Sequence, residues 1–389
     1  MPTFMKRISC LRPCSIALWI LVFLFSAEAQ QTYFPQKNWV VKNPIETGMR
    51  ASLIDSALAL ARLHETSTDP ILRVALQQSY AREPGYRIFG PVKDRGKPVG
   101  LIIHKGYVVG QWGDPDQVDM TFSVTKSFLS TVAGLAMDAG LIGEIDEKVK
   151  AYVWDSTFQE SHNAKISWRH LLDQSSDWSG CLFEFCDWAD RPPRDGTIEE
   201  WKSRKLLEPG AVFEYNDVRV NLLAYALLQV WRKPLPQVLK EKIMDPIGAS
   251  TTWRWYGYDN SFVNIDGVMV QSVSGGGHFG GGLFISTRDM ARFGLLFLRK
   301  GMWNGKQLVS REWIEAARTP SKANPSYGLM WWLNTENTLP GLSKDIYYAD
   351  GYGGNKILVD EENDLVIVVR WMDNSKFSEF LKLVYASLN

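Results

Sequence analysis

Strand-like segments at both ends of the chain constrain its fold more than any other feature. Residues 100–112 read as two short strands that turn at Lys105-Gly106, which is typical of a β-hairpin. Further strand-like segments come much later, at 327–334, 344–350, 355–360 and 364–372, and 375–388 reads as an amphipathic helix. The residues between them lack the regular strand–helix alternation of a parallel sheet. We therefore predict an α+β fold, with one antiparallel sheet built from both chain ends, flanked by helices, and a helix-rich region beside it.

The first 29 residues have the pattern of a secretory signal. Lys6, Arg7 and Arg12 precede or border an apolar run at 15–26, and Ala27-Glu28-Ala29 forms an A-x-A cleavage site. The apolar run is too short to span about 30 Å of hydrocarbon, so we expect no stable membrane anchor. We expect residues 1–29 to be removed and residues 30–389 to form one domain, with a helix-rich insert at about 140–270. The product would be exported, either periplasmic or secreted, from a bacterium.

Charge excludes two classes of partner. The chain contains 43 basic and 43 acidic residues, which give a formal net charge of zero. A protein that binds nucleic acid or an anionic membrane surface usually carries a basic excess. We therefore expect a small-molecule partner, with no nucleic acid and no membrane surface, and the sequence leaves the oligomeric state open.

Cysteine and histidine positions bear on disulfides and metals. Cys10 and Cys14 leave with the signal, so Cys181 and Cys186 remain as a close pair. In an oxidising compartment such a pair is expected to form a disulfide. The alternative, a metal site, lacks a second cluster of cysteines or histidines, and the five histidines show no ligand spacing. We predict no metal and no cofactor.

Ser123-Val-Thr-Lys126 begins an apolar helical pattern that runs from 124 to 137. One interpretation is a serine cap followed by an ordinary surface lysine. The other is a nucleophile with its base, since residues three apart share a helix face. A cation in the first helical turn is disfavoured by about 0.3–1 kcal/mol, and the same field favours the neutral amine that accepts a proton.

Two other stretches contain candidate site residues. Tyr215 and Asp217 lie just before a helical pattern, where a buried tyrosine and a helix-capping aspartate are the ordinary interpretation. Gly351, Gly353 and Gly354 interrupt a strand-like segment. Glycines inside a strand indicate either a bulge or a place where a ligand approaches the backbone.

Taken together and in this order, the three stretches resemble the motifs of the serine β-lactamase and penicillin-binding-protein-like hydrolases, in the class C branch. Residues 166–178 and 280–294 are similar to connecting motifs of that family, so the likeness covers roughly 95–389. Within the family, the turn at 174–178 and the Tyr-Asn-Asp sequence at 215–217 resemble 6-aminohexanoate-dimer hydrolases and related carboxylesterases most closely.

The resemblance implies an acyl-enzyme mechanism. Ser123 would attack a carbonyl, with Lys126 and Tyr215 carrying its proton to the leaving group. The backbone N–H groups of Ser123 and Tyr352 would form the oxyanion hole. A hydroxyl needs a neighbour that takes its proton, and preorganised N–H donors contribute about 3–4 kcal/mol each at a developing oxyanion.

Two positions depart from the family pattern. Asp217 stands where the family usually has Asn, and its carboxylate would hold Lys126 as an ammonium. That ammonium would lower the pKa of Tyr215 and shift the proton-accepting role onto the phenol. Ala349-Asp350-Gly351 stands where K-T-G or H-x-G is expected, so the cation that helps recognise a β-lactam carboxylate is missing. We therefore do not expect efficient β-lactam hydrolysis.

The remaining candidates concern the walls of the site. The glycine tract at 275–282 lacks the Gly-Lys-Ser ending of a phosphate-binding loop, and we interpret His278 within it as structural. Trp178 is a candidate pocket wall, against the ordinary interpretation of a core tryptophan. Asp217, Trp178 and Gly351 are our candidates for substrate binding.

These observations favour an exported serine hydrolase that cleaves amide or ester bonds of a small substrate through a Ser123 acyl-enzyme. One alternative is a D-amino-acid peptidase or weak β-lactamase acting on cell-wall-like substrates. Another is a non-catalytic sensor, which the presence of Ser123, Lys126 and Tyr215 together disfavours.

Overall fold

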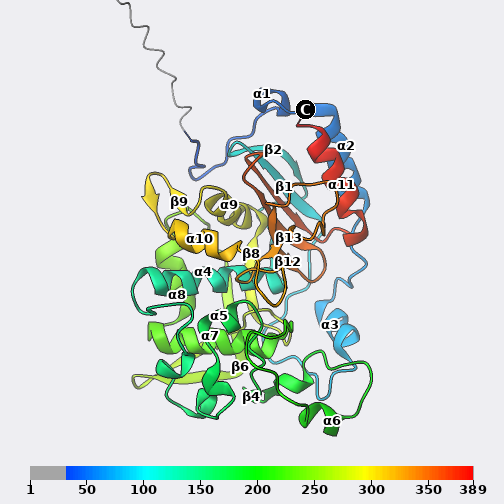
Figure 1. The fold of residues 1–389 in the computed structure, drawn as a ribbon. Coiled ribbons are helices and arrows are strands. Elements are labelled where there is room, and N and C mark those ends of the chain that lie inside the picture. Colours follow the sequence, from blue (N-terminus) through cyan, green and yellow to red (C-terminus); the bar gives the residue numbers. More distant parts are fainter. Residues whose placement is uncertain (1–31, 389) are drawn as a thin grey trace, which may run out of the picture. The chain divides into compact units, whose positions relative to one another are not determined.

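A six-stranded antiparallel sheet joins the two ends of the described chain (Figure 1). The computed structural model describes residues 32–388, and from Tyr33 onward they form one compact unit. The sheet order is β11-β12-β13-β14-β1-β2, and β1 pairs with β14 in the register Val99↔Arg370 to His104↔Leu365. The strands are β1 Val99–His104, β2 Tyr107–Trp112, β11 Trp332–Leu333, β12 Tyr347–Gly351, β13 Asn355–Asp360 and β14 Leu365–Arg370. The predicted sheet from both chain ends is confirmed.

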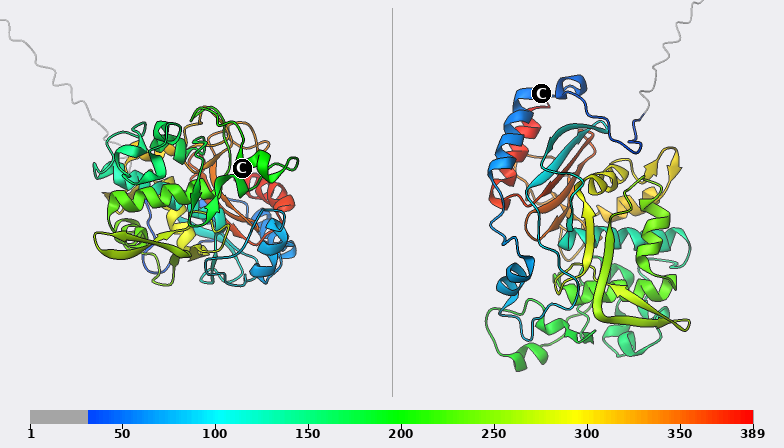
Figure 2. Two further views of the ribbon diagram at one scale, coloured as in Figure 1. Left: turned by 90° about the horizontal axis from the view of Figure 1, so that it is seen from below. Right: turned by 180° about the vertical axis from the view of Figure 1, so that it is seen from behind.

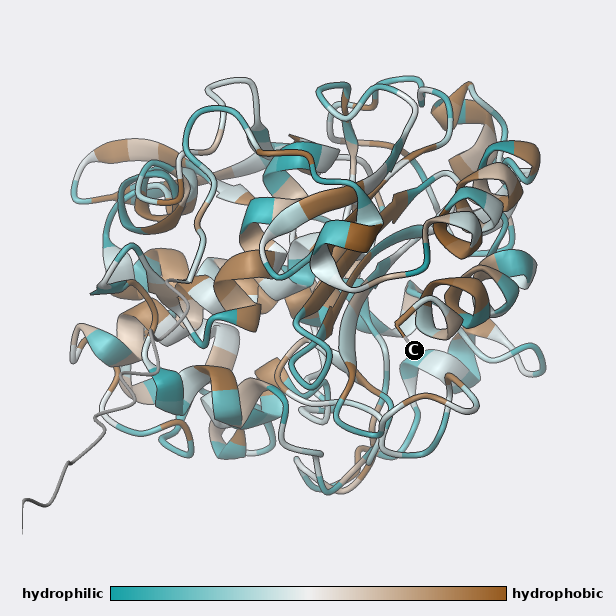
Figure 3. Ribbon diagram, turned by 90° about the horizontal axis from the view of Figure 1, so that it is seen from above, coloured by the Kyte–Doolittle hydropathy of each residue, from teal (hydrophilic) through white to brown (hydrophobic). Residues whose placement is uncertain are grey.

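Helices cover both faces of this sheet, because β1, β13 and β14 are buried at every residue. On one face, α2 (Ala51–Leu63) and α11 (Asn374–Ala386) lie side by side (Figure 1). On the other face, α9 (Thr287–Leu298) packs against β1, β13 and β14. Viewed from above, the strands of the sheet appear largely apolar between their helices (Figure 3).

The helix-rich region lies beside the sheet and contains the two helices that carry the candidate residues. These helices are α4 (Thr125–Asp138) and α7 (Asp217–Trp231), and they contact each other. Twelve residues of each are buried, so each is a core helix instead of a surface helix. The other helices are α1 Pro44–Thr47, α3 Leu72–Tyr80, α5 Trp168–Leu172, α6 Ile198–Lys202, α8 Leu235–Leu239 and α10 Arg311–Ala317.

A second sheet was not expected from the sequence. Its order is β3-β8-β6-β7, from β3 (Val118–Met120), β8 (Gly282–Ser286), β6 (Arg254–Ile265) and β7 (Val268–Val273). The β6–β7 hairpin is the long yellow-green ribbon in the right view of Figure 2. The helix-rich segment predicted for 140–270 therefore ends in β structure.

Other differences are local. The strand expected at 327–334 is reduced to β11, because Met330 has a φ of 63°, which ends an extended conformation. The hairpin turn at Lys105 and Gly106 has φ values of 54° and 84°, as a tight two-residue turn requires. The predicted signal at 1–29 lies outside the described residues. Among residues 32–388, no helix combines the length and apolar character needed to cross a membrane.

Candidate active site

Ser123 lies in a tight 3-10 turn, Phe122–Val124, that leads directly into α4. Phe122 has a φ of 51°, an unfavourable conformation for a residue other than glycine. Phe122 and Val124 are buried, whereas Ser123 between them is half-buried. The turn therefore holds the Ser123 side chain at an accessible point beside the amino end of α4.

Lys126 lies one turn along, and its amine is directed at the serine. Its Nζ is 2.9 Å from the Oγ of Ser123 and 2.6 Å from Oδ1 of Asp217. Lys126 is 1% exposed, so the interpretation as a surface lysine is wrong. A buried amine within hydrogen-bonding distance of a hydroxyl is the arrangement that activates a nucleophile.

Tyr215 and Asp217 reach the same point from the start of α7. Asn216 caps this helix by accepting a hydrogen bond from the backbone N–H of Arg219, so the expected aspartate cap is wrong. The Asp217 carboxylate is left to face Lys126. The Lys126 Nζ lies 4.7 Å from the centroid of the Tyr215 ring, which stacks on Trp332 at 6.0 Å.

Gly351 ends β12 against the backbone of the serine turn. A Cβ built on Gly351 would lie 2.2 Å from the carbonyl oxygen of Thr121 and 3.3 Å from the backbone nitrogen of Ser123. This close approach requires glycine, and the backbone that lies against Gly351 is the serine turn, where the sequence had indicated a bulge or a ligand. Tyr352 follows at once, and its phenol shares a 2.8 Å hydrogen bond with Ser79.

Burial dominates the electrostatics of the group. Burial lowers the pKa of the Lys126 amine; Asp217 opposes this effect and Arg191 adds to it. Burial raises the pKa of the Tyr215 phenol, and the charge of Asp217 raises it further. Burial alone would also raise the pKa of Asp217, but Lys126 and Arg191 outweigh it and hold that pKa below its usual range. The expected lowering of the Tyr215 pKa is therefore wrong, because burial and Asp217 outweigh the opposing effects of Ser123 and Arg191.

A family model described as Beta-lactamase matches residues 99–378, which include all of these groups. The chain belongs to the beta-lactamase family. Members of this family are serine hydrolases, so the resemblance found from the motifs is confirmed.

Individual relatives are distant. An uncharacterized protein of Alkalihalophilus pseudofirmus is 25% identical over 301 residues, covering 69% of this chain and 81% of that protein. A 6-aminohexanoate-dimer hydrolase of Paenarthrobacter ureafaciens is 22% identical over 284 residues, covering 65% and 66%. Among solved structures, a family VIII carboxylesterase covers 90% of this chain and 99% of its own, with a TM-score of 0.58 at 14% identity. The structural likeness establishes the shared fold.

Compared with the beta-lactamase family pattern, the strand beside Ser123 lacks a cation. Ala349 and Gly351 lie on the same face of β12, since alternate residues of a strand face the same side of the sheet. Ala349 is 1% exposed and packs in the core that also contains α4 and α7. The side chain of Asp350 points to the opposite face, where it pairs with Lys356 at 2.5 Å.

Trp178 is not brought into this group. Its side chain is buried in the hydrophobic core, and its indole N–H donates to the carbonyl of Thr157 at 2.9 Å. Within residues 32–388, no hydrogen bond joins Trp178 to Ser123, Lys126 or Tyr215. Trp178 therefore lies where the alternative interpretation, a core tryptophan, would place it.

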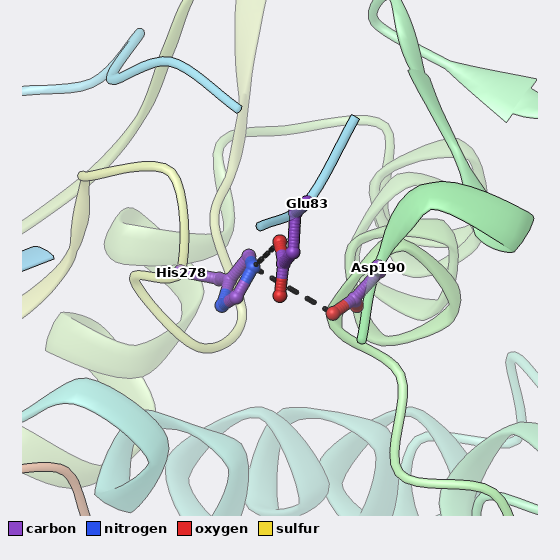
Figure 4. A group of neighbouring side chains, drawn as sticks. All are labelled: Glu83, Asp190 and His278. Atoms are coloured by element: carbon purple, nitrogen blue, oxygen red, sulfur yellow. Dashed lines mark hydrogen bonds and ion pairs between the residues drawn. The ribbon is translucent and has the colours of Figure 1, made fainter. Parts of the chain in front are cut away.

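A charge cluster behind Asp217, buried except for the partly exposed side chain of Arg191, was missed by the sequence reasoning. The Arg191 Nη2 lies 2.6 Å from Asp217 Oδ2 and 3.1 Å from His278 Nδ1. His278 Nε2 lies 2.7 Å from a carboxylate oxygen of Glu83 and 3.6 Å from one of Asp190 (Figure 4). His278 is thus tied into the structure, as predicted. The one usable sequence signal was this histidine within its glycine tract.

Glu83, Asp190 and His278 are also a donor set that a metal ion would accept, since one ligand atom from each lies within 4.8 Å of the others. The guanidinium of Arg191 is bound to Asp190 and His278 and supplies positive charge to the same place. The donor set is therefore engaged by a cation of the chain itself.

Cys181 and Cys186 form the predicted disulfide. The two residues face each other across a short hairpin, β4 (Cys181–Leu182) and β5 (Phe185–Cys186). The loop that carries Asp190 and Arg191 follows directly. The bridge therefore closes the chain next to the charge cluster.

Proposed function

We propose that this beta-lactamase family member cleaves amide or ester bonds of a small substrate through an acyl-enzyme on Ser123. One observation carries the proposal. The buried Lys126 amine lies 2.9 Å from the Oγ of Ser123, and that serine is the accessible member of the pair. The family and the 6-aminohexanoate-dimer hydrolase relative support the same class of reaction.

In the acylation step, Ser123 Oγ bonds to the substrate carbonyl carbon as its proton passes to Lys126 Nζ. The raised pKa keeps Tyr215 a neutral phenol, so it is suited to giving a proton to the departing nitrogen or oxygen while it takes one from Lys126. Lys126, with its lowered pKa, is the better proton acceptor of the two. We therefore assign the base role to Lys126.

Charge that develops on the carbonyl oxygen would be stabilised by the backbone N–H groups of Ser123 and Tyr352. The close approach of Gly351 to the Ser123 nitrogen supports this assignment, because it brings the end of β12 beside the serine turn. Water then attacks the acyl carbon by the reverse proton route. The acid product leaves and Ser123 regains its proton.

We further propose that the substrate is a short ester or linear amide instead of a β-lactam. Ala349 provides no cation for a β-lactam carboxylate, and hydrogen bonds to charged groups contribute about 1.5–3 kcal/mol. The half-buried rings of Tyr215, Trp332 and Tyr352 offer an aromatic surface around Ser123. In this scheme Asp217 affects the reaction through its contact with Lys126. Gly351 contributes because it has no side chain, which lets β12 approach the serine turn.

Export is part of the proposal. The pattern at 1–29 predicts a cleaved leader, and the Cys181–Cys186 disulfide suits an oxidising compartment. Residues 30–389 would then be the mature domain, with its insert at about 140–270.

The decisive experiment is covalent labelling. A fluorophosphonate should add its mass to the Ser123 peptide, and Ser123→Ala should lower kcat/KM for a p-nitrophenyl ester by at least about a thousand-fold. Ser130→Ala is the matched control on the same helix, because its buried hydroxyl has no hydrogen-bond partner in the described structure. Label on another serine, or unchanged turnover in Ser123→Ala, would refute the assignment.

A substrate panel tests the specificity. We expect kcat/KM for a short ester to exceed that for a chromogenic cephalosporin by at least about a hundred-fold, and Ala349→Lys to narrow the gap. A chelator should leave ester turnover unchanged. Efficient cephalosporin or D-amino-acid amide hydrolysis by the unaltered protein would favour the alternative of a cell-wall-directed enzyme.

A further inference from the structure

Asp217 poses a problem for the base role of Lys126. A carboxylate 2.6 Å from an amine favours the ammonium, and an ammonium cannot accept the Ser123 proton. The two oxygens of Asp217 are, however, divided between two cations. Oδ1 faces Lys126 at 2.6 Å, and Oδ2 faces Arg191, also at 2.6 Å.

We propose that Arg191 is a positioning residue that neutralises Asp217, so that the pair presents Lys126 with an uncharged hydrogen-bonding group and leaves the amine free to accept the Ser123 proton. In electrostatic terms, Asp217 together with Arg191 would replace the neutral asparagine that the family motif led us to expect. This inference rests on the proposed function.

The guanidinium is held rigidly enough for that role. Nη1 lies 2.5 Å from Asp190 Oδ1, and Nη2 donates to His278 Nδ1 at 3.1 Å. The planar group lies over the Tyr215 ring at 5.3 Å and over the Tyr80 ring at 5.7 Å. Its backbone N–H donates to Glu83 at 3.2 Å. Arg191 is therefore fixed from both its main chain and its side chain.

The remaining charges near Lys126 are also accounted for. Asp190 accepts hydrogen bonds from the backbone N–H groups of Asp217 and Val218, at the positive end of the 15-residue helix α7. Burial raises the pKa of Glu83 to about 8 and lowers that of His278 far below its usual value. Burial raises the pKa of Asp190 to about 6, so near pH 7 this carboxylate is also charged and shares Arg191 with Asp217. Among the described residues, Arg191 is the cation that lies against the second oxygen of Asp217.

The two phenols add no charge. Burial raises the pKa of Tyr80, as it does that of Tyr215, so both stay neutral near pH 7. Removing Arg191 would therefore leave Lys126 facing a carboxylate without this cation, and removing the Asp217 carboxylate would leave Lys126 near a guanidinium that is paired with Asp190 alone. The two substitutions should shift the proton affinity of Lys126 in opposite directions.

The test is a pH profile of kcat/KM for ester hydrolysis, with the pH dependence of fluorophosphonate labelling of Ser123 as a second readout. A charge within about 4–6 Å of an ionisable group shifts its pKa by about 1–3 units. The acid limb of this profile is the fall of kcat/KM at low pH, where Lys126 becomes protonated. We expect Arg191→Gln to move the midpoint of this limb to higher pH by at least about one pH unit. Asp217→Asn should move it down by a similar amount, and the double variant should lie near the unaltered protein. Arg191→Lys should keep most of the original profile.

Arg204→Gln is the matched control. Arg204 also pairs with two acids, Asp177 and Asp187, and its side chain is 27% exposed against 31% for Arg191, but it does not contact Asp217. It should leave the acid limb in place. If Arg191→Gln fails to fold, the difference between Asp217→Asn and the double variant remains the test, because it isolates the effect of the guanidinium; no difference between them would overturn the role of Arg191.

The outcomes separate the two proposals. Suppose that Ser123 is labelled but that Arg191→Gln leaves the acid limb of the kcat/KM profile unshifted, or lowers kcat/KM equally at every pH. Either result would overturn the role of Arg191 and leave the proposed function standing. An unaltered protein that takes no label on Ser123 would overturn both.

Discussion

The six-stranded sheet and the amino end of α7 are both buried, yet opposite kinds of interaction hold them. In the sheet, β13 and β14 pair apolar residues across each other and pack against helices on both faces. At α7, Arg219 reaches Asp177 and Asp187, each at 3.1 Å, and donates from Nε to the carbonyl of Trp178. Many similar apolar contacts therefore stabilise the sheet, whereas a few ion pairs and hydrogen bonds stabilise the amino end of α7.

The candidate active site lies where these two regions meet. Gly351 approaches the serine turn from the sheet, and Asp217 approaches it from α7. The apolar side provides a fixed position, and the charged side provides proton affinities that a neighbouring charge can adjust. We therefore expect single substitutions near the amino end of α7 to lower the free energy of unfolding much more than single substitutions in the sheet.

The largest expected effect is that of Arg219→Met. It leaves the buried carboxylates of Asp177 and Asp187 without this partner, and breaking a buried ion pair costs about 3–5 kcal/mol of unfolding free energy. The control is Arg169→Met, which removes an exposed pair with Asp146 and should cost at most about 1 kcal/mol. Urea unfolding of both variants gives the comparison, and equal losses would contradict it.

The next effect concerns the disulfide that borders the charged region. Replacing Cys181 and Cys186 by Ala together should lower the free energy of unfolding by about 2 kcal/mol, the chain-entropy value for so short a loop. Alkylation of the unreduced protein followed by mass analysis verifies the bridge first. An unchanged unfolding midpoint would mean that the charge cluster holds the loop without the bridge.

A smaller effect is expected in the sheet. Ile367 of β14 is fully buried and lies opposite Ile102 and Leu358. Ile367→Val removes one methyl group and should cost about 0.5–1.5 kcal/mol. Val268→Ala, at a position that is 63% exposed, is the control and should cost less than about 0.5 kcal/mol. A loss as large as that of Arg219→Met would refute the proposed contrast.

The last effect is absent at pH 7 and appears only in acid, as a pH dependence of stability in the helix-rich region. His170 Nδ1 accepts a hydrogen bond from the backbone N–H of Ser167, and burial lowers the pKa of His170 to about 4. Because the folded pKa lies below the ordinary value near 6.5, the stabilisation is complete above pH 6.5 and is lost as the pH falls through about 4.

His170→Gln tests this dependence. Glutamine can preserve the capping box with Ser167 but cannot titrate. Urea unfolding at pH 7 and pH 4.5 should therefore show a smaller difference in the variant than in the unaltered protein. A difference of the same size in both proteins would exclude His170 as the group responsible.

Sequence patterns predicted the parts of the site that lie on regular elements. Ser123 and Lys126 share a helix face, and Tyr215 and Asp217 lie at the start of another helix, so spacing and motif order were sufficient to predict that these side chains lie close together. Arg191 lies on a loop without periodicity, with a φ of 51°, and it reaches Asp217 only through the tertiary fold. The β6–β7 hairpin was missed because strands without a clear alternation resemble loops in sequence.

The pairing of β1 with β14 also determines when the site can form. Arg370, at the end of β14, donates from its guanidinium to the carbonyls of Met120 and Ile285 and so anchors the strand that leads into the serine turn. The contact joins residues about 250 positions apart. Contacts this distant in sequence slow folding, because the intervening chain must be ordered first. A chain emerging from the ribosome therefore cannot complete the surroundings of Ser123 until Arg370 has been made, and a chain shortened before Arg370 should never do so.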